Sequence, residues 1–285
     1  MLRLNGSAFI TGAGSGIGRG VALAFARYGV NRLALLDQRH DGLQETCQQI
    51  QKESPHTEME IIPADVSNET SIQRAVSQAS KLFNRIDYGV NCAGIAPSPE
   101  MTHEMTLKDW QKVIDVNLTG VWICQKHLLR QMLNQERRGD HEGRGAIINI
   151  ASMYGLIAPP GSMAIAPYTA SKHGQSAQSS RITYMGSTDW NHACRRNGAD
   201  EDERQDAKIY AKKGIRINAI CPGYIVTPLI AGSIHSGSMD NEFERTPVGR
   251  AGTVEEIADS IAFLASPLSS FMYGTGMTVD GGYSV

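Results

Sequence analysis

Short apolar runs alternate with longer amphipathic stretches along the whole chain. Strands are expected where such runs are bounded by turn residues, and helices where apolar positions recur at intervals of three and four. The predicted strands cover residues 7–11, 32–36, 59–63, 88–91, 146–151, 215–220 and 277–279. The clearest predicted helices cover residues 17–28, 41–53, 72–83, 106–132 and 253–265.

This alternation predicts βαβ units, and therefore an α/β fold with a doubly wound, seven-stranded parallel sheet (a Rossmann fold). Each predicted strand is apolar through its length, which is typical of strands covered on both faces. The sequence contains no internal repeat and no linker of biased composition. We therefore expect residues 1–285 to form a single domain.

Composition narrows the function classes. The formal net charge of -2 gives no basic surface for nucleic acid or an anionic membrane. No apolar run approaches the roughly 20 residues that span a bilayer. The five cysteines lie far apart and without zinc-site spacing, so we expect reduced thiols, no metal site and a cytoplasmic protein.

A glycine-rich turn separates the first predicted strand from the first helix. It contains Gly12, Gly14, Ser15, Gly16, Ile17 and Gly18. Missing side chains let the backbone approach a pyrophosphate, and the helix start presents free N–H groups. A tight turn with incidental glycines is the alternative, which the strand–turn–helix context disfavours. The turn predicts a dinucleotide-binding loop at Gly12, Ser15, Gly16, Ile17 and Gly18.

Asp37 ends the second predicted strand, about twenty residues beyond this loop. A carboxylate there accepts hydrogen bonds from an adenosine ribose and repels a 2′-phosphate. Arg39 is an opposing signal, because a nearby guanidinium can pair with that phosphate. We expect NAD(H) to be favoured over NADP(H).

The glycine pattern T-G-x-x-x-G-x-G resembles that of classical short-chain dehydrogenases/reductases, and further motifs agree in order along the chain. They are Asp65-Val66, Asn91-Cys92-Ala93-Gly94, Asn117, Ser152, Tyr168-Thr169-Ala170-Ser171-Lys172, Pro222-Gly223, Thr227 and the segment 274–282. Cys92 departs from the family pattern, which usually has a small or amide residue there. The resemblance implies cofactor contacts from Asp65, Val66, Asn91, Ala93, Gly94, Tyr168, Lys172, Pro222, Gly223 and Thr227.

The Tyr168, Lys172 and Ser152 combination suits hydride transfer to a carbonyl. The alkoxide that forms needs a proton donor, but a free tyrosine, with a pKa of about 10, is a poor acid–base group near neutrality. Lys172 lies one helical turn after Tyr168, so we expect its ammonium to lower the pKa of Tyr168. Ser152 can hold the substrate oxygen. By resemblance, Lys172 also binds the nicotinamide ribose, and Asn117 supports a water chain that relays protons.

The stretch after Lys172 departs from the family pattern. The expected helix end, 206–214, arrives late, and the segment near 182–205 lacks an apolar stripe. We predict a mobile loop there. The sequence on either side joins smoothly without it, which leaves open whether the segment belongs to the mature protein. By resemblance, the helix after Lys172 packs against a second subunit, so a homodimer or homotetramer is expected, with this segment as the complication.

The sequence therefore predicts an NAD(P)-dependent oxidoreductase acting on a small molecule, with Asn117, Ser152, Tyr168 and Lys172 as the catalytic set. Residues 96–105, 155–166 and 226–250 are expected to line the substrate pocket, and Met153, Ile157, Ile225, Pro228, Leu229 and Ile230 favour an apolar or alicyclic substrate. A 3-oxoacyl-thioester reductase and a catalytically impaired dinucleotide-binding regulator are the alternatives. A methyltransferase ranks last, because it has no need of the Tyr/Lys pair.

Overall fold

The computed structural model describes residues 2–139, 141–179 and 205–285. Within these residues, seven strands form one parallel sheet in the order β3-β2-β1-β4-β5-β6-β7. The strands are β1 (Ser7–Thr11), β2 (Arg32–Asp37), β3 (Glu58–Pro63), β4 (Tyr88–Asn91), β5 (Gly145–Ile150), β6 (Ile215–Pro222) and β7 (Gly276–Val279). The strand order turns back between β1 and β4, so the predicted doubly wound fold is confirmed.

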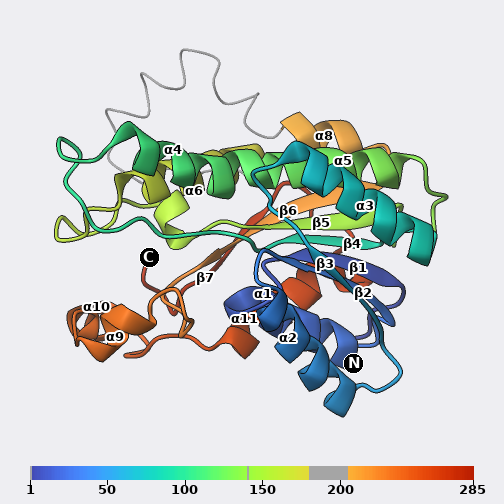
Figure 1. The fold of residues 1–285 in the computed structure, drawn as a ribbon, viewed down its shortest axis with the longest axis horizontal. Helices are drawn as coiled ribbons and strands as arrows, with labels where there is room; N and C mark the ends of the chain where they lie inside the picture. The colour runs from blue at the N-terminus through green and yellow to red at the C-terminus, as the bar shows by residue number, and fades with distance from the viewer. Residues whose placement is uncertain (1, 140, 180–204) are drawn as a thin grey trace.

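Helices cover both faces of the sheet. Figure 1 shows α3, α4, α5, α6 and α8 on one face and α1, α2 and α11 on the other. Their bounds are α1 (Gly16–Arg27), α2 (His40–Glu53), α3 (Glu69–Phe83), α4 (Leu107–Ile114), α5 (Gly120–Leu133), α6 (Ala166–Ser179), α8 (Gln205–Ala211) and α11 (Val254–Ala265). The structure also contains two short helices, α9 (Ala231–His235) and α10 (Asp240–Arg245), and two 3-10 turns, η2 (Met153–Gly155) and η3 (Pro267–Ser269).

Each face of the sheet has its own hydrophobic core. Phe25 of α1 and Ile261 of α11 are fully buried on one face, and Ile72 of α3 and Leu128 of α5 on the other. The edge strands differ from the prediction of strands apolar through their length. In β3 only Ile62 is buried, and β7 has no buried residue. An edge strand has a neighbour on one side only, so its cover is incomplete.

The predicted helix over 106–132 is correct in its start and incomplete in its shape. The Thr106 hydroxyl accepts the Asp109 N–H at 3.1 Å, as expected of an N-cap. A π-helical segment, η1 (Asp115–Thr119), separates α4 from α5. Such segments insert a wider turn into an α-helix and recur at functional sites.

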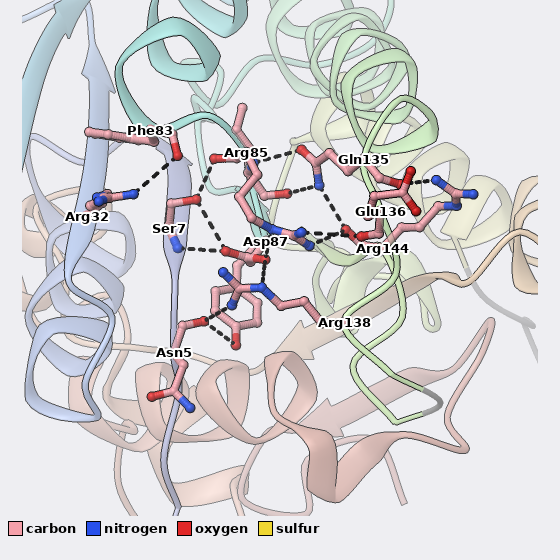
Figure 2. Close-up of polar contacts among 12 residues, drawn as sticks. Asn5, Ser7, Arg32, Phe83, Arg85, Asp87, Gln135, Glu136, Arg138 and Arg144 are labelled. Atoms are coloured by element: carbon pink, nitrogen blue, oxygen red, sulfur yellow. Dashed lines mark hydrogen bonds and ion pairs between the residues drawn. The ribbon is translucent and has the colours of Figure 1, made fainter.

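Polar side chains gather where the amino ends of the central strands meet (Figure 2). The Asp87 carboxylate, only 6% exposed, accepts Arg85 Nε at 2.6 Å and the Ser7 N–H at 2.9 Å. Arg138 Nε lies 3.4 Å from the same carboxylate. These contacts join the starts of β1 and β4 to the connection between α5 and β5.

No helix in the described ranges is both long enough and apolar enough to cross a membrane. The segment near 182–205, which we predict to be a mobile loop, lies outside the described residues except for its last position. The sheet resumes at Ile215, as expected.

Candidate active site

The chain turns sharply between β1 and α1, at the predicted phosphate-binding loop. Gly12 and Gly16 have left-handed backbones, with φ of +68° and +51°. A Cβ added to Gly18 would lie 2.1 Å from the carbonyl oxygen of Gly12, so α1 packs directly on the loop. The loop is therefore a backbone cradle that side chains would fill, which fits a pyrophosphate group.

Two further predicted residues lie at this cradle. Ser15 is the N-cap of α1, and its side chain makes no capping hydrogen bond. Thr227, from the segment after β6, lies close to the loop: a Cβ added to Gly16 would be 3.6 Å from the Thr227 Cβ. Half-buried Ile17 follows in the first turn of α1. Residues from the two halves of the fold thus meet at the start of α1.

Asp37 stands directly against the glycine loop. Its carboxylate accepts the Gly14 N–H at 3.1 Å and the Arg39 N–H at 3.0 Å. The Arg39 guanidinium lies 3.6 Å from the Asp41 carboxylate, and its side chain is 61% exposed. The acid is therefore fixed at the loop, whereas the cation is paired in solvent with another acid.

Asp65 and Val66 follow β3. The Asp65 carboxylate accepts the N–H and the hydroxyl of Ser67, at 2.9 and 2.7 Å. Partial burial raises the pKa of Asp65, but hydrogen bonds from Ser67 and Gln38 outweigh it and hold that pKa below its usual range. Val66 is buried against Gly120, where an added Cβ would lie 2.9 Å from its side chain.

Thr11 joins the end of β1 to the residues that follow β4. Its hydroxyl oxygen accepts the N–H groups of Cys92 and Ala93 at 3.1 and 3.2 Å. Gly94 follows, and a Cβ there would lie 3.4 Å from Asn117 Oδ1 and 3.9 Å from Lys172 Nζ. The element 91–94 therefore lies between the glycine loop and the Asn117–Lys172 region.

The Asn91 side chain is part of a buried chain of amides. It donates to Asn149 Oδ1 at 2.7 Å, Asn149 donates to Gln125 at 2.8 Å, and Gln125 donates to Asp206 at 2.9 Å. Among the described residues, Asn91 Oδ1 has no hydrogen-bond partner. The donor side of the Asn91 amide thus connects β4 to β5, α5 and α8.

Ser152, Tyr168 and Lys172 come together at the carboxyl end of β5. Ser152 is the N-cap of η2, where its Oγ accepts the Tyr154 N–H at 3.1 Å, and its side chain is hydrogen-bonded to Tyr168. Lys172 Nζ lies 5.6 Å from the centre of the Tyr168 ring. Ser152, before η2, and Tyr168 and Lys172, in the first turns of α6, thus lie close together.

Burial dominates the electrostatics of this group. It lowers the pKa of Lys172 to about 8. It also raises the pKa of Tyr168, against the opposing effect of the Ser152 hydrogen bond. The expectation that Lys172 lowers the pKa of Tyr168 is therefore not met, because loss of solvent disfavours the tyrosinate more than its neighbours favour it.

Lys172 is held by acceptors that the sequence analysis did not identify. Its ammonium donates to the Ile150 carbonyl at 2.6 Å and to Gln175 Oε1 at 3.0 Å. Gln175 is fully buried, and its amide donates to the main-chain carbonyl of Asn117. Gln175 therefore bridges Lys172 and Asn117, although its polarity suggested a helix without a buried face.

Asn117 lies in η1, where both ends of its side-chain amide are engaged. Oδ1 accepts the Ile95 N–H at 2.8 Å, and Nδ2 donates to the Ile95 carbonyl at 2.9 Å. The side chain thus fixes the segment after Gly94. The main-chain carbonyl of Asn117 accepts a hydrogen bond from Gln175, which in turn accepts one from Lys172.

Pro222 and Gly223 end β6 at the same edge of the sheet. The Gly223 N–H donates to the Val279 carbonyl at 3.0 Å, and an added Cβ would lie 2.7 Å from Asp280 Cα. This close approach requires glycine and brings the end of β7 beside the segment that carries Thr227.

The three predicted substrate segments follow β4, β5 and β6, so all begin at the carboxyl edge of the sheet (Figure 1). More than half of the surface of Met101, Val226, Leu229 and Val248 is exposed there. Met153 and Ile225, which we expect among the pocket side chains, are buried. Among the described residues, no group of three His, Cys, Asp or Glu side chains is placed to hold a metal ion.

Comparison with known families shows which family the chain belongs to. A family model described as short chain dehydrogenase matches residues 7–183, more than half of the chain. The chain belongs to the short-chain dehydrogenase family. A second model, described as enoyl-(acyl carrier protein) reductase, matches residues 196–284. The predicted resemblance is confirmed, and this member of the family is an NAD(P)-dependent oxidoreductase.

Its relatives match over nearly their whole length. Short-chain dehydrogenase fogB of Aspergillus ruber is 34% identical, with 98% of this chain and 97% of that protein covered. Cis-4-hydroxycyclohexanecarboxylate dehydrogenase of Sinomonas cyclohexanicum is 33% identical, with 97% and 96% covered. Cyclohexanol dehydrogenase of Acinetobacter sp. strain SE19 is 34% identical, with 98% and 95% covered.

Solved structures agree. A levodione reductase structure superposes with a TM-score of 0.82 at 29% identity, covering 98% of this chain and 97% of the other. A structure described as a putative 2-deoxy-D-gluconate 3-dehydrogenase from Agrobacterium tumefaciens, with bound NADP, gives a TM-score of 0.79 at 26% identity. It covers 99% of this chain and 98% of the other.

Gly18→Ala tests the cradle. The new methyl group would lie 2.1 Å from the Gly12 carbonyl oxygen, so the loop must move away from α1. Overpacking of about 1–3 kcal/mol predicts an increase of roughly 5- to 150-fold in the Kd for the dinucleotide. Fluorescence titration with reduced cofactor measures it, with the melting temperature followed in parallel.

Gly232→Ala is the matched control, since an added Cβ meets nothing within 4 Å at that helical glycine. It should leave the Kd unchanged. Equal Kd values for the Gly18→Ala variant and the unmodified protein would contradict a loop that contacts the cofactor.

Proposed function

We propose that this enzyme interconverts an alicyclic alcohol and its ketone, with Tyr168 as the proton donor and acceptor. The observation that carries the proposal is the group in which the buried Ser152 is hydrogen-bonded to Tyr168 beside the buried Lys172. A hydroxyl pair next to a buried ammonium can bind a carbonyl oxygen and deliver a proton to it.

The chain supplies binding and proton transfer around the cofactor. The nicotinamide, when bound, accepts or donates the hydride. The cradle of Gly12, Gly16 and Gly18 would hold the pyrophosphate, and the segments at Asp65–Val66 and 91–94 would flank the adenosine half. Ser152 would orient the substrate oxygen toward the Tyr168 hydroxyl, which gives up its proton during reduction and recovers it during oxidation.

Gln175 would hold the Lys172 ammonium and connect it to Asn117. A buried cation is costly unless its donors are satisfied. Ile150 and Gln175 supply two acceptors to Lys172, and the bridge through Gln175 ends on the Asn117 carbonyl. We infer that Gln175 occupies part of the path that the family resemblance assigns to a proton-relaying water chain.

The position of Asp37 supports NAD(H) as the preferred cofactor. Its carboxylate is anchored by Gly14 and Arg39 backbone N–H groups, where a 2′-phosphate would meet a negative charge. Arg39, the residue that could favour NADP(H), pairs with Asp41 in solvent.

The substrate class rests on two supports. Relatives at similar identity are named for cyclohexanol, cis-4-hydroxycyclohexanecarboxylate and levodione. The segments after β4 and β6 expose apolar side chains that include Met101, Val226 and Leu229. Reduction of a 3-oxoacyl thioester is the second candidate. The family model over residues 196–284 is described by an acyl carrier protein substrate, which shares the thioester but has an enoyl group in place of the 3-oxo group.

Assembly and location are further parts of the proposal. We infer a homodimer or homotetramer from the family resemblance, to be tested by native mass measurement. The cytoplasmic location rests on Cys47, Cys92, Cys124 and Cys221, which are free thiols.

Tyr168→Phe removes one hydroxyl and keeps the ring. Turnover should fall by roughly 10²-fold or more, the usual contribution of a positioned general acid, while the dinucleotide Kd changes little. Steady-state kinetics with cyclohexanol and cyclohexanone checks this. Tyr88→Phe is the control, because it removes a buried hydroxyl that donates to Asn5 at the opposite edge of the sheet. Normal turnover in the Tyr168→Phe variant would contradict the assignment, because another group would then have to transfer the proton.

The pH dependence should have opposite signs in the two directions. Reduction needs the protonated Tyr168, which exists below its pKa, and burial raises that pKa above its ordinary value. Reduction should therefore stay constant through neutral pH and fall only in alkaline solution. Oxidation needs the tyrosinate and should rise with pH. Profiles of kcat/KM that fall together as pH rises would contradict this assignment.

Asp37→Ala removes the proposed ribose acceptor and the charge that opposes a 2′-phosphate. The ratio of kcat/KM with NADH to that with NADPH should fall by about tenfold or more, the scale of a charged hydrogen bond. Glu53→Ala, which removes an exposed carboxylate from α2, is the control. A clear preference of the unmodified enzyme for NADPH would assign the pocket to Arg39.

A further inference from the structure

A partly buried cluster of three tyrosines and one carboxylate lies between four segments far apart in sequence. Tyr154 belongs to η2, Tyr224 follows β6, Glu242 belongs to α10, and Tyr283 lies near the C-terminus. Figure 1 shows α10 and the C-terminus at the end of the molecule where β7 ends. We call these four residues the tyrosine–Glu242 network.

Hydrogen bonds connect every member. The Tyr154 and Tyr224 hydroxyls contact each other, and the Tyr224 hydroxyl donates to Glu242 Oε2 at 3.2 Å. The Tyr283 hydroxyl donates to the same carboxylate oxygen. Arg245, whose side chain is 60% exposed, pairs with the other oxygen at 3.3 Å. The Glu242 side chain itself is only 8% exposed, so its charge depends on these donors.

The rings pack as closely as the hydroxyls. The Tyr224 ring makes edge-to-face contacts with Tyr154, Phe243 and Tyr283, with centroids 6.1, 6.1 and 5.4 Å apart. Such pairs stabilise beyond their buried area. Tyr224 is therefore the centre of the network and the residue through which α10 reaches η2.

The network has a fixed hydrogen-bond direction. An ionised carboxylate can only accept hydrogen bonds, so Tyr224 and Tyr283 each donate their one hydroxyl proton to Glu242. The Tyr224 oxygen is then left to accept from Tyr154. Met163 Sδ, 3.6 Å from the Tyr154 oxygen, is the competing and much weaker acceptor. The charge on Glu242 thus orients Tyr154 through Tyr224.

Tyr154 is coupled directly to the reaction group. Its N–H donates to Ser152 Oγ at 3.1 Å. The next residue, Gly155, packs on the helix that carries Tyr168, because an added Cβ would lie 2.5 Å from the Lys172 carbonyl oxygen. A shift of η2 would therefore move Ser152 relative to Tyr168 and Lys172.

We propose that Glu242 is a positioning residue for the reaction, acting through Tyr224 and Tyr154 on the Ser152 hydroxyl. It also fixes α10 and the C-terminal segment against η2. The inference rests on the proposed function for its kinetic consequence, whereas the coupling between α10 and η2 is independent of it.

The kinetic test uses Glu242→Gln and Tyr154→Phe, singly and combined. The glutamine keeps the shape but must donate from one end, which reverses part of the network. We expect kcat/KM with cyclohexanone to fall by about tenfold in each single variant, with the dinucleotide Kd unchanged. The double variant should lose no more than the worse single one, because both break the same path. Tyr28→Phe, which loses a surface hydrogen bond of 2.9 Å to Asp259, should match the unmodified enzyme.

Two kinetic outcomes would overturn the proposal. Multiplying losses in the double variant would show that Glu242 and Tyr154 act independently. A lower melting temperature with unchanged kcat/KM in Glu242→Gln would show a role in folding stability alone.

Amide hydrogen exchange, which needs no turnover, separates this inference from the proposed function. Tyr154→Phe should speed exchange in 240–245, and Glu242→Gln should speed it in 153–157. If the unmodified protein reduces no alicyclic ketone, the proposed function fails, and the exchange data still decide the coupling. Unchanged exchange in the distant segment of both variants would refute it.

Discussion

A parallel sheet covered by helices on both faces leaves room for polar and charged side chains mainly at the two ends of its strands. The Phe25–Ile261 and Ile72–Leu128 cores exclude charge from both faces of the central strands. At the amino edge, Asp87 and its arginines join strands and loops. At the carboxyl edge, the glycine loop, Asp37, Ser152 and Thr227 converge although they lie far apart in sequence. The location of the candidate active site thus follows from the burial of the sheet.

The carboxyl edge combines backbone contacts with buried polar side chains. Gly18 and Gly223 permit main-chain contacts that any side chain would prevent. Thr11, Asn117 and Gln175 then use hydrogen bonds to hold the segments so formed. Lys172 requires the most from its surroundings, because its buried ammonium needs hydrogen-bond acceptors. They come from β5 and from its own helix.

Local sequence signals predict the fold and the position of the glycine-rich turn between β1 and α1. Strand limits agree within about two residues, because the apolar runs are short and end at glycine, aspartate or proline. Gln175 and Asn91 show where this method stops. A polar residue in a helix or strand suggests a solvent-facing position or a ligand contact, and only the fold reveals partners such as Lys172 or Asn149. The direction of the pKa shift of Tyr168 has a similar origin, since desolvation depends on the complete surroundings of the hydroxyl.

The π-helical segment at 115–119 also determines how the long helix between β4 and β5 faces its neighbours. One extra residue in a helix rotates everything after it by about 100°. The side chains of α4 and α5 therefore follow two different phases, and each half packs against its own set of elements. A single-residue deletion there would restore an uninterrupted helix but turn Trp122, Gln125 and Leu128 away from their present neighbours. Apart from Asn117, whose side-chain amide is engaged at both ends, this stretch should accordingly tolerate substitution better than any change in its length.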